Sequence, residues 1–254
     1  MSGFDDHFVK ADFKRQVINL AVAHGDFPFF WLQNLERDAN PDATWRTLMV
    51  LGCMGDPHHA HLAYQFMVSN DSRVRAWACF ALGQMRDRGS LKELEGLCHD
   101  PSTRVRVQAH QAISAIRGMH HHLRHRTDHH NGNNKLILIS DDAVKVQNNL
   151  SGALAMMGFR VAVAASEGET LQKARHLKPA AIITDNQKGH DNLSGLNMTW
   201  DICRDAELRE TLIFMLTADC IEPVFLWHGG DYYLTKSVDP LEKVIGVVSD
   251  YLQC

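Results

Sequence analysis

The sequence lacks both a long apolar run and a strong charge of either sign. No apolar stretch approaches the roughly 18 residues that a membrane-spanning helix needs. The acidic start has no basic segment followed by an apolar one, as a targeting segment would. The net charge of −4, with neutral histidines, does not favour broad attraction to nucleic acid. We therefore expect a cytoplasmic protein with no membrane insertion and no nucleic-acid partner.

The sequence also lacks paired cysteines. Its six cysteines show no paired or CxxC spacing, so reduced thiols explain them more simply than disulfides do. At 254 residues and 45% hydrophobic content, the chain can form one large or two ordinary domains with packed cores. The cysteines are Cys53, Cys79, Cys98, Cys203, Cys220 and Cys254.

The amino-terminal half repeats itself. A shift of 31 positions superimposes the stretch 72–85 on the stretch 103–116, and a fainter copy lies around 51–56. Each copy carries an apolar stripe with helical spacing, and a second, shorter helix is expected in each period, around 58–69 and 90–98. Helix pairs that cannot bury their faces alone stack into a solenoid, so we predict an α-solenoid over this half.

This half resembles the HEAT repeat family in its short-period form, whose pattern is D-x-x-x-V-R-x-x-A-x-x-A-L-G. Both copies match it from V-R to the second alanine, and the Asp stands three positions before the Val in the first copy and five before it in the second. The resemblance covers about 40–117 well and implies a domain over 1–117 that binds a protein partner, which the sequence does not identify. The residues that carry it are Asp71, Val74, Arg75, Ala78, Ala81, Leu82 and Gly83, then Asp100, Val105, Arg106, Ala109 and Ala112.

The segment 118–134 joins the two halves and is rich in histidine. It is polar and has no apolar stripe, which is typical of a linker. Metal binding by its imidazoles is one alternative, and sensitivity to pH near neutrality is another. We prefer the linker, because a metal cage also needs fixed geometry and supporting hydrogen bonds. The histidines are His120, His121, His122, His125, His129 and His130.

The carboxy-terminal half alternates short apolar runs with stretches of helical spacing. This pattern predicts buried parallel strands joined by helices. The strands are expected at 136–140, 160–165, 180–184, 211–216 and 231–235. Such a doubly wound sheet binds its ligands beyond the carboxyl ends of its strands. Helix starts are indicated by Ser166 with Glu169, a capping box, and by Asp239 before Pro240.

Polar residues stand at the ends of four of these apolar runs. They bring three carboxylates, one hydroxyl and one ammonium to a single sheet edge, which is the chemistry needed to move a phosphoryl group onto a carboxylate. The residues are Asp141, Asp142, Asp185, Thr217 and Lys236.

The stretch 135–254 resembles the receiver domain of two-component response regulators. The motifs ILISDD, IITD, LIFMLTA and GGDYYLTK carry this resemblance at the family's spacing. It implies an α/β, flavodoxin-like fold with a doubly wound five-stranded parallel sheet of order 2-1-3-4-5. The whole chain is then a multidomain protein, with an α-solenoid followed by this α/β domain.

The resemblance also implies a role for each polar residue. Asp185 is the phosphoacceptor, Thr217 turns its hydroxyl toward the new phosphoryl group, and Lys236 contacts a phosphoryl oxygen. Tyr233 occupies the position of the family's switch aromatic and is expected to move inward behind Thr217. Mg²⁺ is the implied cofactor, because it suits an incomplete oxygen-only site. Its ligands are Asp141, Asp142, Asp185 and the backbone carbonyl of Gln187.

Three features depart from the family pattern. The usual Met-Pro after the phosphoacceptor is replaced by the polar stretch 186–195, and Lys236 is followed by Ser237 instead of proline. The fourth helix of the domain, which contains Pro223, is expected to be about one turn short or distorted. Because that face usually carries output contacts, the family's dimer mode is not transferred.

We expect a response regulator that is not an enzyme. A sensor histidine kinase or a phosphotransfer protein phosphorylates Asp185 and thereby controls what the HEAT repeats bind. One alternative is a phosphorylation-independent scaffold with a divergent receiver. Another is a HEAT protein similar to the bilin lyases, although 1–117 shows no catalytic cluster.

Overall fold

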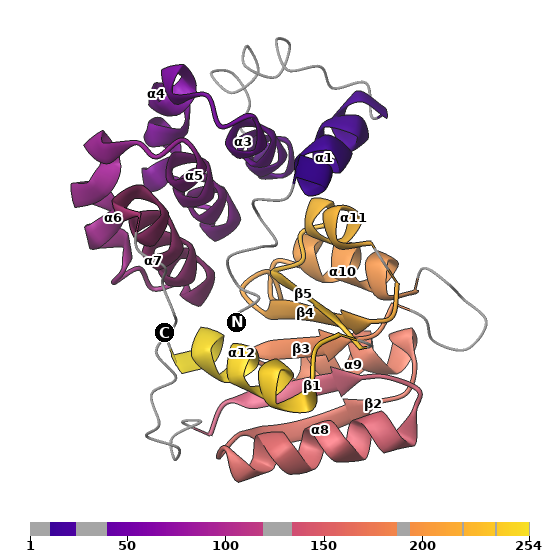
Figure 1. Cartoon of the computed structure of the whole chain (residues 1–254). Coiled ribbons are helices and arrows are strands. Elements are labelled where there is room, and N and C mark those ends of the chain that lie inside the picture. The colour runs from indigo at the N-terminus through magenta and orange to yellow at the C-terminus, as the bar shows by residue number, and fades with distance from the viewer. Residues whose placement is uncertain are drawn as a thin grey trace. The chain divides into compact units, whose positions relative to one another are not determined.

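The computed structural model describes residues 11–23, 40–118, 134–186, 194–219, 221–236 and 238–253 (Figure 1). The chain divides into two compact units, Met1–Arg124 and His125–Gln253, each with its own core. The predicted linker 118–134 lies outside the described residues except at its two ends. Within the described ranges, no helix has the length and apolar character needed to cross a membrane.

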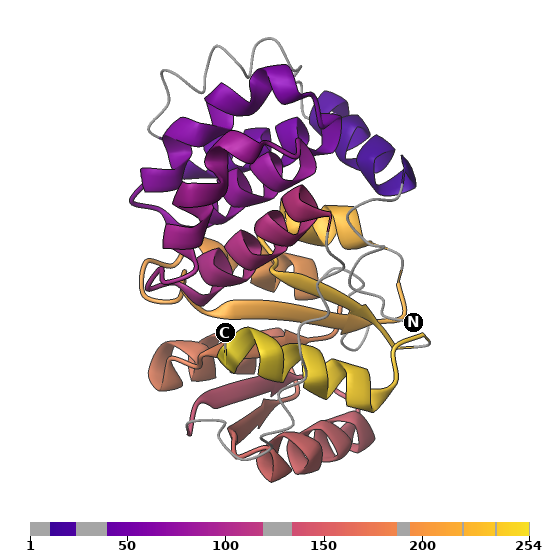
Figure 2. The same ribbon diagram turned by 60° about the vertical axis from the view of Figure 1, so that its left-hand side comes forward.

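The elements described in the amino-terminal unit are all helices. Helix α3 packs against α5, and α5 packs against α7 (Figures 1 and 2). The predicted repeat helices are confirmed as α5 and α7. The shorter helix expected at 58–69 is instead divided into η1, α4 and η2. The elements are α1 (Ala11–Ala23), α3 (Pro41–Met54), η1 (Pro57–His59), α4 (Ala60–Tyr64), η2 (Gln65–Val68), α5 (Ser72–Gln84), η3 (Arg88–Ser90), α6 (Leu91–Leu97) and α7 (Thr103–Arg117).

The Asp and Arg of the repeated motif join one repeat to the next. Asp71 caps α5, because its carboxylate accepts hydrogen bonds from the backbone N–H groups of Arg73 and Val74 at 2.8 and 3.2 Å. Arg75 donates to both carboxylate oxygens of Asp100, each at 2.9 Å, in a fork that only a guanidinium can form. The motif therefore supplies both the start of a helix and the connection to the following repeat.

The carboxy-terminal unit is a five-stranded parallel sheet with the order β2-β1-β3-β4-β5, as predicted. Helices α8 and α12 contact each other on one face, and α9 and α10 contact each other on the other (Figures 1 and 2). The strands are β1 (Leu136–Ser140), β2 (Arg160–Ala164), β3 (Ala181–Thr184), β4 (Leu212–Thr217) and β5 (Tyr232–Thr235). The helices are α8 (Val144–Met156), α9 (Glu167–Leu177), α10 (Ser194–Arg204), α11 (Glu222–Trp227) and α12 (Leu241–Gln253).

Strand burial explains why the apolar runs predicted the sheet so closely. Every residue of β3 and β4 is buried, as a parallel sheet with both faces covered requires. Half of the capping box predicted at the start of α9 is present, since the Ser166 hydroxyl accepts from the backbone N–H of Glu169 at 3.3 Å. The Glu169 carboxylate accepts instead from the backbone N–H of Ala165, one residue earlier, at 2.8 Å. Helix α11 has only six residues, in agreement with the predicted shortening.

We expect Gly83→Ala to lower the free energy of unfolding by about 1–3 kcal/mol, because overpacking forces backbone shifts. A Cβ at this position would lie 2.7 Å from the Cα of Ala112, so α5 and α7 would have to separate. Denaturant unfolding of the full chain measures the change. Gly96→Ala in α6 is the matched control, since its Cβ would meet nothing within 4 Å. Equal effects of the two substitutions would contradict the close packing of α5 on α7.

Candidate functional site

The sheet register aligns the strand ends that carry the predicted site. Ser140 of β1 pairs with Thr184 of β3, so the residues that follow them, Asp141 and Asp185, leave the sheet side by side. Lys236 directly follows β5 and donates its backbone N–H to the Thr217 carbonyl oxygen of β4 at 2.9 Å. Four strands therefore deliver their predicted polar residues to one edge, at their carboxyl ends.

Lys236 lies between two carboxylates. Its Nζ donates to Asp141 Oδ2 at 2.8 Å and to Asp185 Oδ2 at 2.6 Å. The exposed fractions of the side chains are 26% for Lys236, 5% for Asp141 and 12% for Asp185. One partly buried ammonium thus compensates two nearly buried carboxylates, which could not lie so close without a cation.

The two carboxylates fix the charge of Lys236. Burial alone would lower the pKa of its ammonium, but hydrogen bonds to Asp141 and Asp185, and their charges, raise the pKa above the ordinary 10.5. The pKa of Lys236 is therefore higher in the folded state than in the unfolded state. The contribution of this pairing to the stability of the fold is complete below about pH 10.5, and it is lost as the pH rises through the pKa of the folded state. Lys236 is therefore positively charged throughout the physiological range.

The predicted metal ligands are only partly brought together. Asp141 and Asp185 meet at Lys236, whereas the side chain of Asp142 is exposed. The backbone carbonyl of Gln187 lies outside the described residues. Among the side chains that are described, no group of three or more His, Cys, Asp or Glu is placed to hold a metal ion. The roles of Asp142 and Gln187 stay predictions.

Thr217 is the last residue of β4, and Tyr233 lies within the neighbouring strand β5. The Thr217 side chain is buried, and its hydroxyl lies 3.5 Å from Asp219 Oδ2. The ring of Tyr233 is also buried, and its hydroxyl accepts a hydrogen bond from the backbone N–H of Ile221 at 3.3 Å. The predicted switch aromatic therefore already lies inward in this structure, at the start of α11.

The residue that closes the turn carrying Lys236 was not identified from the sequence. Asp239 accepts a hydrogen bond from the backbone N–H of Thr235 at 2.7 Å and donates its own N–H back to the Thr235 carbonyl oxygen at 2.8 Å. These bonds close the turn that carries Lys236, in the place where the family has a proline after the lysine. Asp239 was expected only to cap the last helix. An Asp that follows the end of a strand by a few residues often closes a turn, and this signal could have indicated the turn from the sequence.

The backbone behind Asp185 is closely packed. A Cβ on Gly195, in the first turn of α10, would lie 2.4 Å from the Asp185 carbonyl oxygen. The Gly195 N–H donates to the Asn186 carbonyl oxygen at 3.2 Å. Only glycine allows the start of α10 to approach Asp185 so closely, and this requirement was not recognised from the sequence.

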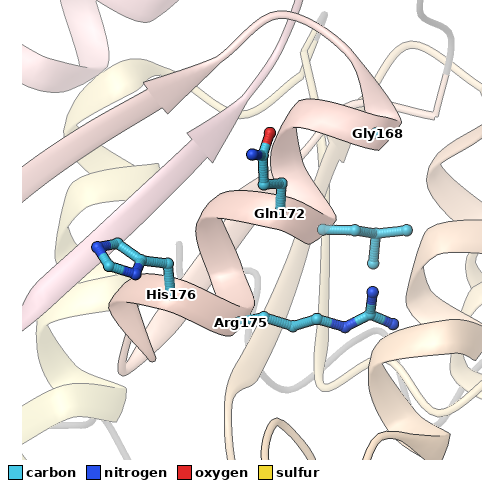
Figure 3. A pocket seen from close by; sticks show the side chains of 5 residues that line it. Gly168, Gln172, Arg175 and His176 are labelled. Atoms are coloured by element: carbon cyan, nitrogen blue, oxygen red, sulfur yellow. The ribbon is translucent and has the colours of Figure 1, made fainter.

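A shallow hollow lies along α9 and contains none of the predicted site residues. Gly168, Leu171, Gln172, Arg175 and His176 line it. Figure 3 shows Gln172, Arg175 and His176 pointing in different directions from this one helix. Arg175 instead pairs with Asp205, its Nε lying 3.0 Å from Oδ2. The hollow therefore has no convergent polar groups, which a ligand pocket would need.

Comparison with known proteins agrees with the division into two units. Residues 30–117 match the family model for HEAT repeats. No curated protein matches the chain. The amino-terminal unit therefore contains HEAT repeats, as its helix pairs and its Asp–Arg connections indicate.

Solved structures of response regulators are similar to the carboxy-terminal part. Chemotaxis response regulator CheY4 of Vibrio cholerae is 22% identical over 46% of this chain and 98% of its own, with a TM-score of 0.42. A response regulator from Chloroflexus aurantiacus is 28% identical over 47% of this chain and 98% of its own, with the same TM-score. A CheY-like receiver domain from Methanospirillum hungatei is 23% identical, covering 47% and 94%, with a TM-score of 0.42.

The strand order β2-β1-β3-β4-β5 defines the fold independently of these scores. This order is that of flavodoxin-like sheets, to which CheY belongs. The carboxy-terminal unit therefore has a flavodoxin-like fold, which is also the fold of CheY, and in this chain it follows the HEAT repeats.

We expect Lys236→Met to lower the free energy of unfolding by about 2 kcal/mol at pH 8, because two carboxylates are left facing each other. Millimolar Mg²⁺ should restore part of the loss by taking the place of the ammonium. Thermal unfolding with and without Mg²⁺ measures both effects.

Lys243→Met is the matched control for this prediction. The Lys243 side chain is also 26% exposed, but its ammonium contacts one carboxylate, Asp239, at 2.5 Å. Mg²⁺ should not rescue this variant, because one carboxylate alone binds the ion weakly. Equal rescue of the two variants would show that Asp141 and Asp185 do not form a cation site.

Proposed function

We propose that the carboxy-terminal unit is a phosphorylation-dependent receiver in which Asp185 accepts the phosphoryl group. The supporting observation is that the Lys236 ammonium contacts both Asp141 and Asp185 at the carboxyl ends of their strands. The proposed donor is a sensor histidine kinase or a phosphotransfer protein, whose phosphohistidine carries a labile N–P bond. Attack by a carboxylate oxygen of Asp185 on phosphorus forms an O–P bond and breaks the N–P bond, and the departing imidazole takes up a proton.

The resting contacts of Asp185 support this proposed attack. Its Oδ1 accepts from the backbone N–H of Asn186 at 2.7 Å, and its Oδ2 accepts from Lys236 at 2.6 Å. A carboxylate is a weak nucleophile toward an anionic phosphoryl group, so position and charge compensation provide most of the acceleration. After transfer, Lys236 can move from the Asp185 oxygen to a phosphoryl oxygen without leaving the site.

Mg²⁺ fits the oxygen donors of this site. Asp141 and Asp185 both contact one small cationic group, so their carboxylates are close enough to share a metal ion. Magnesium commonly uses one or two carboxylates and completes its coordination with phosphate and water, so a cage of three side chains is unnecessary. Asp141 and Asp185 would hold it, with Asp142 beside them. The bound ion supplies compensation of phosphoryl charge during transfer.

The amino-terminal unit is proposed to bind a protein partner and not to catalyse a reaction. Stacked HEAT repeats form an extended surface suited to protein binding. We propose that the phosphorylation state of Asp185 controls this binding, and that the protein acts in the cytoplasm.

We expect acetyl phosphate with Mg²⁺ to phosphorylate the wild-type chain and to leave Asp185→Asn unmodified, because the amide is not a nucleophile. Intact-mass spectrometry measures the added phosphoryl group, and hydroxylamine should remove it, as it does from an acyl phosphate. Asp205→Asn is the control, since Asp205 follows α10 at the opposite edge of the sheet. Modification of Asp185→Asn to the wild-type level would overturn the proposal.

A scaffold that works without phosphorylation is the second candidate. It is favoured by the buried position of Tyr233, whose hydroxyl already accepts the backbone N–H of Ile221. Beryllofluoride, which mimics a phosphoryl group, distinguishes the two. A receiver that switches should show Mg²⁺-dependent shifts of the Thr217 and Tyr233 amide resonances, whereas the scaffold should show none.

We expect the set of bound proteins in native extract to differ between wild type with beryllofluoride and Asp185→Asn, because only the former reaches the phosphorylated-like state. Quantitative mass spectrometry of the captured proteins measures the difference. Asp205→Asn with beryllofluoride should capture the same set as wild type. Identical sets from all three proteins would show that phosphorylation does not control partner binding.

A further inference from the structure

Two polar side chains beside the site are used by no step of the proposed transfer. Asn186 directly follows the phosphoacceptor, and Asp219 comes two residues after Thr217. Asn186 is only 2% exposed, and its Nδ2 donates to Asp219 Oδ2 at 2.8 Å. This bond joins the ends of β3 and β4, which are paired in the sheet.

Asp219 also contacts the hydroxyl of Thr217 in two ways. The backbone N–H of Asp219 lies 3.4 Å from Thr217 Oγ1, and Thr217 Oγ1 lies 3.5 Å from Asp219 Oδ2. Both distances are long for hydrogen bonds, so each contact is weak. The short bond from Asn186 fixes Asp219 more firmly than either of them does.

A hydroxyl has a single proton to donate. In the receiver proposed above, the Thr217 hydroxyl must donate its one hydrogen bond to an oxygen of the phosphoryl group on Asp185. In the resting structure the same hydroxyl faces the carboxylate of Asp219. The two arrangements exclude each other, so any interaction that strengthens the resting one opposes the phosphorylated one.

We propose that Asp219, anchored by Asn186, is a positioning residue that holds the Thr217 hydroxyl in the resting receiver and competes with the phosphoryl group for it. This inference rests on the proposed function. The pair Asn186–Asp219 would then restrain the change of the receiver from its resting to its phosphorylated state. It also explains why a buried amide follows the phosphoacceptor, since an apolar residue there could not anchor a carboxylate.

The test is a titration of the full-length chain with beryllofluoride in the presence of Mg²⁺, followed by the amide resonances of Thr217 and Tyr233. Asp219→Ala should lower the half-saturating concentration about two- to fivefold, as expected for the loss of a competing contact that is long and weak. Asn186→Ala should lower it about two- to threefold, although it changes no charge. Glu207→Gln, an exposed carboxylate ahead of β4 at the opposite edge, controls for net charge and should leave it unchanged.

A double-mutant cycle separates competition for the hydroxyl from simple charge repulsion. In a Thr217→Ala background, Asp219→Ala should no longer tighten binding, because no hydroxyl remains to be released. Equal tightening in both backgrounds would overturn the positioning role and leave only a charge effect. If Asp219→Ala does not fold, Asp219→Asn replaces it in the same cycle, with a smaller expected shift.

The outcomes for the two proposals are distinguishable. A wild-type chain that takes up no beryllofluoride contradicts the proposed function and this inference with it. A wild-type chain that binds it, with Asp219→Ala and Asn186→Ala unchanged or weaker, contradicts the inference alone.

Discussion

The contact of one ammonium with two carboxylates is the constraint on which the site depends. Asp141 and Asp185 are nearly buried, so water cannot screen their repulsion well. Lys236 therefore determines how closely the carboxylates at the ends of β1 and β3 can approach each other. The turn closed by Asp239 in turn determines the position of Lys236. A phosphoryl group would add negative charge to this balanced cluster. Charge balance is thus the reason why a divalent cation and a movable lysine belong to the same proposed mechanism.

Tyr233 connects this edge of the sheet to helix α11. Its hydroxyl accepts the backbone N–H of Ile221, immediately before α11, so the side chain holds the start of that helix. Helix α11 has only six residues, and a helix this short depends on tertiary contacts more than on its own hydrogen bonds. Its Phe225 ring also lies 6.2 Å from the Tyr233 ring. Movement of Tyr233 would therefore alter both the first hydrogen bond and the packing of α11.

The features that depend on strand periodicity and register could be predicted from the sequence. The features that depend on turn geometry could not. Asp141, Asp185 and Lys236 could be placed together because parallel strands end at one edge, whatever the loops do. The pair Asn186–Asp219 could not, because their contact depends on how two irregular segments bend after β3 and β4. The division of 58–69 into η1, α4 and η2 was missed for a similar reason. Helical spacing does not report where hydrogen bonding changes from i,i+4 to i,i+3.

The scale of these local changes matches what regulation of a protein partner requires. A tenfold change in affinity corresponds to about 1.4 kcal/mol. One buried hydrogen bond contributes about 0.5–1.5 kcal/mol, and more when a charged group takes part. The bonds that would change on phosphorylation are those of Thr217, Tyr233 and Lys236, so their sum is sufficient without any rearrangement of the sheet. Because the HEAT repeats are held by their own Asp–Arg connections, such as Arg75 to Asp100, they can act as a stable binding surface while only the receiver edge changes.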